Sequence, residues 1–189
     1  LIFTGSGTEA DNLAVHGVAD AKSYRFIPKI ITTDSEHPAI GNTVGYLEEK
    51  GFEIVRLSTK GGVIDIGELE DALDERVILV TVMRVNNETG AVYDVKKIFD
   101  TVKKAVPDAV THTDAVQGYM KIGCEPKKLG ADLVSVSAHK INGPKGVGAL
   151  WCSSQIIKSK KIRPVIFGGG QEGGFRSGTE NLIGIAGFA

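Results

Sequence analysis

The sequence is poor in cysteine and has no long hydrophobic run. Its 189 residues include only two cysteines, Cys124 and Cys152, which lie far apart and form no C-x-x-C motif. This spacing argues against a disulfide framework or a zinc cluster and is typical of a reducing compartment. No apolar stretch approaches the roughly 20 residues that a membrane-spanning helix needs. We therefore expect a cytoplasmic protein without a membrane segment, in which each cysteine is a small buried residue.

The sequence also lacks an excess of charge of either sign. It has 22 Lys and Arg residues against 23 Asp and Glu residues, so the net charge is -1 at pH 7. This balance gives no long-range attraction to nucleic acid or to an anionic membrane. Internal repeats, heptads and low-complexity tracts are missing too, and the length suits one domain over residues 1–189. Because the chain opens on Leu1 within an apolar run, we expect it to be a piece of a longer protein.

Strand and helix patterns alternate along the chain. Apolar or β-branched runs predict strands at Leu1–Thr4, Lys29–Thr33, Glu53–Leu57, Val77–Met83, Val110–Thr113, Asp132–Ser137 and Gly148–Cys152. Periodic apolar positions and helix-start residues predict helices at Thr8–Ser23, Pro38–Lys50, Glu68–Asp74 and Val95–Val106. The alternation predicts an α/β fold of three layers, with helices on both faces of a mainly parallel, mixed sheet.

Five polar or glycine-rich segments lie at or just after the ends of predicted strands. Ligands of parallel sheets bind at the carboxyl ends of the strands, so we expect these segments to share one rim of the sheet. The segments are Gly5–Thr8, Asp34–His37, Asn86–Glu88, Asp114–Gln117 and Ser137–Lys140.

The first of these segments indicates a phosphate site. An apolar strand, a tight glycine turn and a helix start follow one another there, and a helix N-terminus binds phosphate through its free N–H groups. Gly5–Ala10 also spells G-x-G-x-x-A, which is similar to a dinucleotide fingerprint, and Asp34 could bind a ribose. A dinucleotide, however, gives no role to the polar residues of the other segments.

Four residues of the other segments could take part in chemistry, and each has a structural alternative. Lys140 follows a buried strand, so its amine could be partly desolvated and form a Schiff base, or it could be a solvated loop residue, as we expect for Lys145. Asp114 could hold the ring nitrogen of a heterocycle protonated or cap a helix. His37 could stack on a ring and move protons or belong to a loop. Asn87, together with its neighbours Asn86 and Glu88, could donate to a ligand's oxygens or belong to a turn.

The order of these segments resembles the cysteine desulfurases, the NifS-like branch of the class-V aminotransferases. The matching stretches are "GTEADN", "EHPAI", "VNNETG", "DAVQ", "SAHKINGPKGVGAL" and "GGGQEGGFRSGTEN". The resemblance implies the large domain of a fold type I, aspartate aminotransferase-like enzyme that uses pyridoxal 5'-phosphate (PLP). It also implies a cytoplasmic homodimer that takes sulfur from L-cysteine, leaving L-alanine and an enzyme persulfide for iron–sulfur scaffold or other acceptor proteins.

The resemblance further implies roles for individual residues. Lys140 would carry PLP as a Schiff base, and Asp114 would pair with the ring nitrogen. Gln117 would bond the phenolic oxygen, Asn87 would lie near it, and His37 would stack on the ring and assist proton transfer. The residues implied to hold the phosphate are Gly7, Thr8, Ser137 and His139, together with Thr179 from a neighbouring subunit.

Two functional residues of the family fall outside these 189 residues. The family's persulfide cysteine and the arginine that binds the substrate carboxylate both lie after the segment that matches residues 176–181. We therefore expect the chain alone to bind PLP weakly and to release no sulfide from cysteine. Two alternatives stay open: another class-V enzyme, such as a selenocysteine lyase or an aminotransferase, and a non-catalytic remnant that only dimerises.

Overall fold

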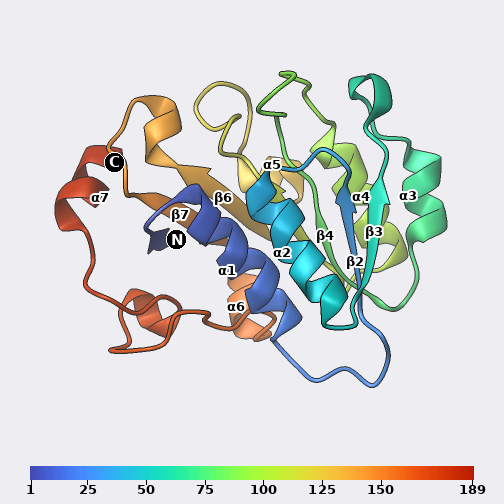
Figure 1. Cartoon of the computed structure of the whole chain (residues 1–189), viewed down its shortest axis with the longest axis horizontal. Helices are drawn as coiled ribbons and strands as arrows, with labels where there is room; N and C mark the ends of the chain where they lie inside the picture. Colours follow the sequence, from blue (N-terminus) through green and yellow to red (C-terminus); the bar gives the residue numbers. More distant parts are fainter.

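The computed structural model describes residues 1–189 and contains one seven-stranded sheet (Figure 1). The strands are β1 (Ile2–Thr4), β2 (Lys29–Thr33), β3 (Glu53–Leu57), β4 (Val77–Thr81), β5 (Val110–Asp114), β6 (Leu133–Ser137) and β7 (Gly148–Cys152). Their order across the sheet is β1-β7-β6-β5-β4-β2-β3. The neighbours from β6 to β3 pair in parallel, whereas β7 is antiparallel to both β6 and β1.

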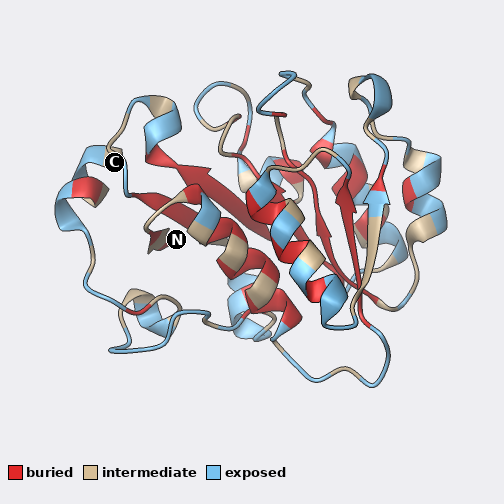
Figure 2. Ribbon diagram, in the orientation of Figure 1, coloured by how far each residue is buried: buried red, intermediate tan, exposed pale blue.

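Helices cover both faces of the sheet. They are α1 (Gly7–Ala19), α2 (Pro38–Glu49), α3 (Ile66–Ala72), α4 (Val95–Ala105), α5 (Pro126–Leu129), α6 (Ser154–Lys158) and α7 (Leu182–Phe188). One buried apolar cluster packs α1 and α2 on one face, and a second packs α3, α4 and α5 on the other (Figure 2). The predicted three-layer α/β fold with a mainly parallel, mixed sheet is therefore confirmed. None of the helices is both long and apolar enough to span a bilayer.

The predicted elements differ from the structure mainly at helix ends. The first helix ends at Ala19 and not at Ser23. Asp20 caps this end, and its N–H bonds to the carbonyls of His16 and Val18. The third helix starts at Ile66 and not at Glu68, because the Asp65 side chain caps it by accepting from the Gly67 N–H at 2.8 Å. The short helices α5, α6 and α7 were not predicted, since four to seven residues display too little periodicity.

The antiparallel strand β7 explains how the first turn of the chain reaches the rim of the sheet. Because β1 and β6 are both antiparallel to β7, they run in the same direction. The turn after β1 therefore lies at the same edge as the carboxyl ends of β4, β5 and β6. The sequence predicted the shared rim but not the pairing that produces it.

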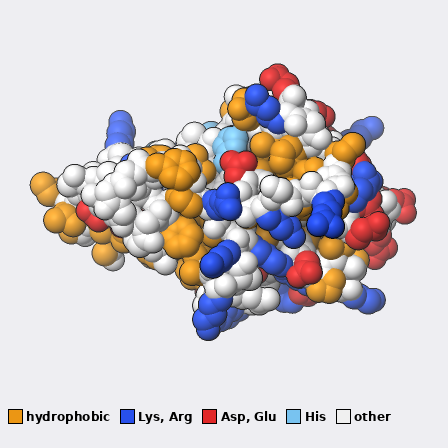
Figure 3. Space-filling model, turned by 90° about the horizontal axis from the view of Figure 1, so that it is seen from below, with side chains coloured by type: hydrophobic (Ala, Val, Ile, Leu, Met, Phe, Trp, Pro, Cys, Tyr) orange, Lys and Arg blue, Asp and Glu red, His pale blue; other side chains and the backbone are white.

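The C-terminal part of the chain carries exposed apolar side chains. Phe167, Leu182 and Ile183 are 80%, 73% and 89% exposed. Figure 3 shows hydrophobic side chains at several places on one face, including its narrow end, while charged side chains of both signs lie mainly on the broader part. Exposed apolar side chains mark a site of association where they form one contiguous patch.

Candidate active site

A cavity of about 270 Å³ lies at the carboxyl ends of β4, β5 and β6, beside the first turn of α1. The structure brings residues from five separate segments of the chain together around it. Of the ten predicted site residues, nine line this cavity: Gly7, Thr8, His37, Asn87, Asp114, Gln117, Ser137, His139 and Lys140.

Thr179 is the predicted residue that lies elsewhere. It lines a separate hollow beside β1, together with Arg176 and Glu180. Arg176 donates to the Glu9 carboxylate from Nε at 2.6 Å, so this segment is tied to the first turn of α1. The contact of Thr179 with the phosphate site of a second subunit stays a prediction.

The start of α1 presents free N–H groups to the cavity. Ser6 caps the helix, because its hydroxyl accepts from the Glu9 N–H at 3.1 Å and its carbonyl accepts from the Ala10 N–H at 3.1 Å. The N–H groups of Gly7 and Thr8 have no acceptor within the chain, and both residues line the cavity. This arrangement can bind a phosphate, since the positive end of the helix dipole points at it.

Close backbone packing fixes the position of this turn. A Cβ on Gly7 would lie 2.8 Å from Val116 Cγ2 and 3.3 Å from Ser137 Cβ. A Cβ on Gly148 of β7 would lie only 2.4 Å from the Ser6 carbonyl carbon and 2.8 Å from the Gly7 nitrogen. Two glycines that are far apart in sequence therefore let the helix start sit directly on the sheet.

Replacing Ser6 with alanine tests the role of the cap. We expect Ser6→Ala to lower the free energy of unfolding by about 1 kcal/mol, because the Glu9 N–H loses its acceptor. Ser153 is a matched control, since it caps α6 in the same way and lies outside the cavity. Urea unfolding should show similar losses for Ser6→Ala and Ser153→Ala, whereas phosphate-ligand affinity should fall only in Ser6→Ala. Equal affinities in both variants would contradict a phosphate role for this turn.

Asp114 supplies a buried carboxylate at the floor of the cavity. It ends β5, is almost fully buried and accepts from the Val116 N–H at 2.8 Å. Burial raises the pKa of Asp114, while this N–H and the charges of His37 and Lys140 oppose the rise. A carboxylate placed in this way can hold a proton on a basic nitrogen of a bound ring.

Lys140 lies in the short turn Ala138–Ile141 that follows β6. Lys140 is exposed, because the turn carries it past the end of the strand, so the structure favours the solvated alternative over partial desolvation. Lys140 nevertheless lines the cavity, as do Thr8 and Asp114. Next to it, Ser137 Oγ and His139 Nδ1 share a hydrogen bond of 2.9 Å, which orients the imidazole.

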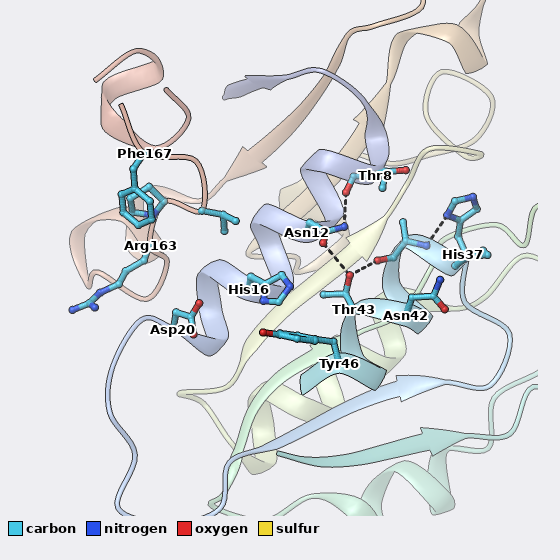
Figure 4. A pocket seen from close by; sticks show the side chains of 14 residues that line it. Thr8, Asn12, His16, Asp20, His37, Asn42, Thr43, Tyr46, Arg163 and Phe167 are labelled. Atoms are coloured by element: carbon cyan, nitrogen blue, oxygen red, sulfur yellow. Dashed lines mark hydrogen bonds between the residues drawn. The ribbon is translucent and has the colours of Figure 1, made fainter. Parts of the chain in front are cut away.

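His37 caps α2 and joins the cavity to a second, open hollow. Its Nδ1 accepts from the Ala39 N–H at 3.1 Å, and Pro38 starts the helix. Figure 4 shows the second hollow, a groove of about 790 Å³ between α1 and α2, in which Thr8 and His37 lie at one end and Tyr46 lies farther along. Thr8 and His37 therefore face both spaces.

Asn86, Cys124 and Cys152 have structural surroundings. The Asn86 side-chain oxygen accepts from the Glu88 and Thr89 N–H groups, so Asn86 builds the turn that presents Asn87 to the cavity. Neither cysteine is paired. Burial raises the pKa of Cys152 to about 12 and also raises that of Cys124. Both thiols are poor nucleophiles here. Cys124 is buried, as the sequence predicted, whereas Cys152 is only half-buried.

Asp11 is a cavity residue that sequence reasoning missed. Its side chain is buried within α1 and lines the cavity beside Asp114. One feature of the sequence could have identified Asp11 as buried. It is a carboxylate among the apolar residues Ala10, Leu13 and Ala14, which form the buried stripe of this helix.

Comparisons with known sequences all point to the same protein family. The family Aminotransferase class-V matches residues 1–189. The chain is 44% identical to "Cysteine desulfurase IscS" of Dictyoglomus turgidum and 42% identical to "Cysteine desulfurase" of Trichormus azollae, each match covering 100% of this chain and 46% or 45% of the relative. The chain thus spans about half the length of the curated relatives it matches.

Solved structures give the same result. A NifS-like protein superposes with a TM-score of 0.92 and 41% identity, covering 99% of this chain and 50% of that protein. The protein SspA, solved in complex with cysteine, superposes with a TM-score of 0.89 and 34% identity, covering 99% of this chain and 53% of that protein.

Proposed function

Since this chain belongs to the aminotransferase class-V family, we propose that it forms the cofactor-binding part of a PLP-dependent cysteine desulfurase. The whole enzyme would remove sulfur from L-cysteine, leave L-alanine and hold the sulfur as a persulfide on a cysteine outside residues 1–189. The sulfur would then pass to an acceptor, such as an iron–sulfur scaffold protein. The relatives named cysteine desulfurase and the cysteine complex of SspA support this substrate.

One observation carries the proposal. A lysine amine, a buried carboxylate and the free N–H groups of a helix start surround a single cavity. PLP needs these three groups, because it has an aldehyde, a basic ring nitrogen and a phosphate. The residues therefore fit PLP as a group, whereas a dinucleotide would leave Lys140 and Asp114 without a role.

The proposed binding roles follow from the position of each side chain around the cavity. The Gly7 and Thr8 N–H groups, with Ser137 and His139, would bind the phosphate. Asp114 would hold a proton on the ring nitrogen. Gln117 and Asn87 would donate to the ring's phenolic oxygen, and His37 would stack on the ring.

Lys140 would do the proton transfer of the reaction. Bound PLP supplies an electron sink for the charge that develops when the substrate's α-proton is removed. The Lys140 amine would take up this proton as a base, and Asp114 would keep the ring nitrogen protonated throughout. His37, held at its Nδ1 by the Ala39 N–H, would present its other ring nitrogen for a second proton transfer.

A homodimer is part of the proposal. The exposed apolar residues Phe167, Leu182 and Ile183 flank the segment that carries Thr179. Burying this surface against a second copy would stabilise the dimer and could place Thr179 at the partner's phosphate site. A cytoplasmic location belongs to the same proposal and is supported by the two unpaired cysteines.

Labelling with PLP tests the cofactor and its lysine together. We expect an absorbance shift when PLP is added, and after borohydride reduction we expect the cofactor's mass on the peptide that contains Lys140. The whole protein and the 189-residue chain should both be labelled there, the shorter one less completely. Label spread over exposed lysines of the whole protein would contradict the proposal.

Product analysis then tests the substrate. The loaded whole enzyme should form alanine from L-cysteine, and it should do so faster than it transfers an amino group from ordinary amino acids. A preference for L-selenocysteine would favour a lyase, and amino transfer would favour an aminotransferase. A whole protein that forms a dimer but takes up no PLP would favour the non-catalytic remnant.

A further inference from the structure

Asp11 places a second buried carboxyl group beside Asp114. Asp11 is only 1% exposed, and its side chain extends from the second turn of α1 to the lining of the cavity. The Oδ1 atom of Asp11 is buried without a hydrogen-bond partner. A buried ionised carboxylate needs several donors or a cation, so the surroundings of Asp11 decide its charge.

His112 is the side chain that could have supplied a cation to Asp11. It lies fully buried on β5, with Nε2 at 3.8 Å from Asp11 Oδ1. Hydrogen bonds join its two ring nitrogens to Thr81 Oγ1 at 2.8 Å and to Ser135 Oγ at 2.9 Å. Burial lowers the pKa of His112 to about 3, so this imidazole is neutral at physiological pH. Asp11 therefore has no positive partner there.

Burial raises the pKa of Asp114 too, but Asp114 has partners that favour its charge. It accepts the Val116 N–H at 2.8 Å, and the charges of His37 and Lys140 across the cavity stabilise its anion. Burial raises the pKa of Asp11 well above its usual range, and the nearby Asp114 charge raises it further, while the Ser135 hydroxyl opposes only part of this rise. Two neighbouring buried carboxylates do not both ionise readily, so the less stabilised one takes a proton.

The remaining titratable groups near Asp11 and Asp114 do not change which of the two carboxyl groups takes the proton. Glu36, from the turn before α2, accepts from the Met83 N–H at 3.0 Å and from Thr33 Oγ1 at 2.7 Å. Burial raises its pKa to about 8, so it is also protonated near neutral pH. The titratable groups near the Asp11–Asp114 pair are thus His112 from β5, Glu36 and His37 from the turn before α2, and His139 and Lys140 from the turn after β6.

We propose that Asp11 is a positioning residue that holds the proton of this buried carboxyl pair and thereby leaves Asp114 as the anion at the floor of the cavity. The consequence for a cofactor ring rests on the proposed function. The protonation of Asp11 does not, because it follows from the groups of the chain itself.

The first test uses the protein without PLP. A protonated Asp11 in the folded state loses its proton on unfolding, so stability falls as pH rises above about 4, the usual value for an unfolded aspartate. One such proton changes the unfolding constant about tenfold per pH unit. We expect Asp11→Asn to remove this factor from the pH dependence measured by urea unfolding between pH 5 and pH 6. Asp20→Asn, an exposed aspartate at the end of the same helix, is the matched control and should keep it.

Carboxyl carbon NMR of the unaltered protein gives the same answer without a substitution. The Asp11 resonance should stay at its protonated position from pH 5 to pH 6, which keeps the proposal testable if Asp11→Asn does not fold. An ionised Asp11 resonance in this range, or an unchanged pH dependence in a folded Asp11→Asn, would overturn the proposal.

The second test uses the whole enzyme loaded with PLP. If Asp11 is already neutral, Asp11→Asn should leave the pH midpoint of the cofactor's absorbance change where it is. A midpoint that falls on removing the Asp11 charge would show that Asp11 was ionised and would overturn the proposal. Failure to bind PLP at all would instead contradict the proposed function, while the measurements without PLP would still decide the state of Asp11.

Discussion

Replacing Lys140 with alanine is expected to abolish borohydride-fixed PLP and to lower turnover of L-cysteine by the whole enzyme. Lys140 is the lysine that lines the cavity, so no other amine in its lining can take over covalent attachment. Loss of a positioned base alone reduces rates by a factor on the order of 10² to 10⁴. Lys140→Arg should be equally inactive, because a guanidinium keeps the charge but does not form the imine.

Lys145 provides the control for this substitution. It is exposed five residues later, in the Gly-Pro-Lys-Gly turn, and lies outside the cavity. Lys145→Ala should retain labelling at Lys140 and turnover. Turnover in Lys140→Ala that equals that of Lys145→Ala would show that another residue attaches the cofactor, and the proposed assignment would then be wrong.

Replacing Gly148 with alanine is expected to have the second-largest effect, although Gly148 bears no functional group. Its new Cβ would lie 2.4 Å from the Ser6 carbonyl carbon and 2.5 Å from the Ser6 carbonyl oxygen. These are backbone atoms of the turn that starts α1, so the turn itself must move. We expect a loss of about 1–3 kcal/mol in the free energy of unfolding, as for other overpacked sites.

PLP affinity should also decrease in Gly148→Ala, because the N–H groups of Gly7 and Thr8 move with the turn. We expect a decrease on the order of tenfold, which corresponds to about 1.4 kcal/mol. Gly45→Ala is the control: Gly45 lies in α2, and a Cβ there meets no atom within 4 Å. That variant should be slightly more stable, by up to about 1 kcal/mol, and should bind PLP normally. Normal PLP affinity in Gly148→Ala would mean that the turn does not hold the phosphate.

The two predictions depend on different kinds of information. Lys140 could be selected from the sequence, because it follows a predicted strand and because the stretch that contains it, "SAHKINGPKGVGAL", resembles the cysteine desulfurases. Gly148 could not be selected, because its importance depends on Ser6, which lies more than a hundred residues away in the chain. Only the pairing of β1 with β7 brings the two together.

The sequence alone determined the layers of the fold and most of the cavity lining. Short apolar or β-branched runs predict the strands, because side chains that are buried on both faces of a sheet are mostly apolar. Polar residues after those strands mark the rim, because parallel strands end at the same edge. Local chemistry of this kind can be read residue by residue, which is why His37, Asp114, Gln117 and Lys140 were all predicted to lie on one rim.

The tertiary structure decided the properties that depend on neighbours far apart in the chain. The exposure of Lys140, the close contact of Gly148 with Ser6 and the place of Thr179 outside the cavity are of this kind. The charge of Asp11 is a further property of this kind, because in the sequence Asp11 looks like an ordinary aspartate of a helix. Its burial beside Asp114 and a neutral His112 arises from the packing of α1 on β5, and electrostatic energies depend on such distances and not on sequence spacing.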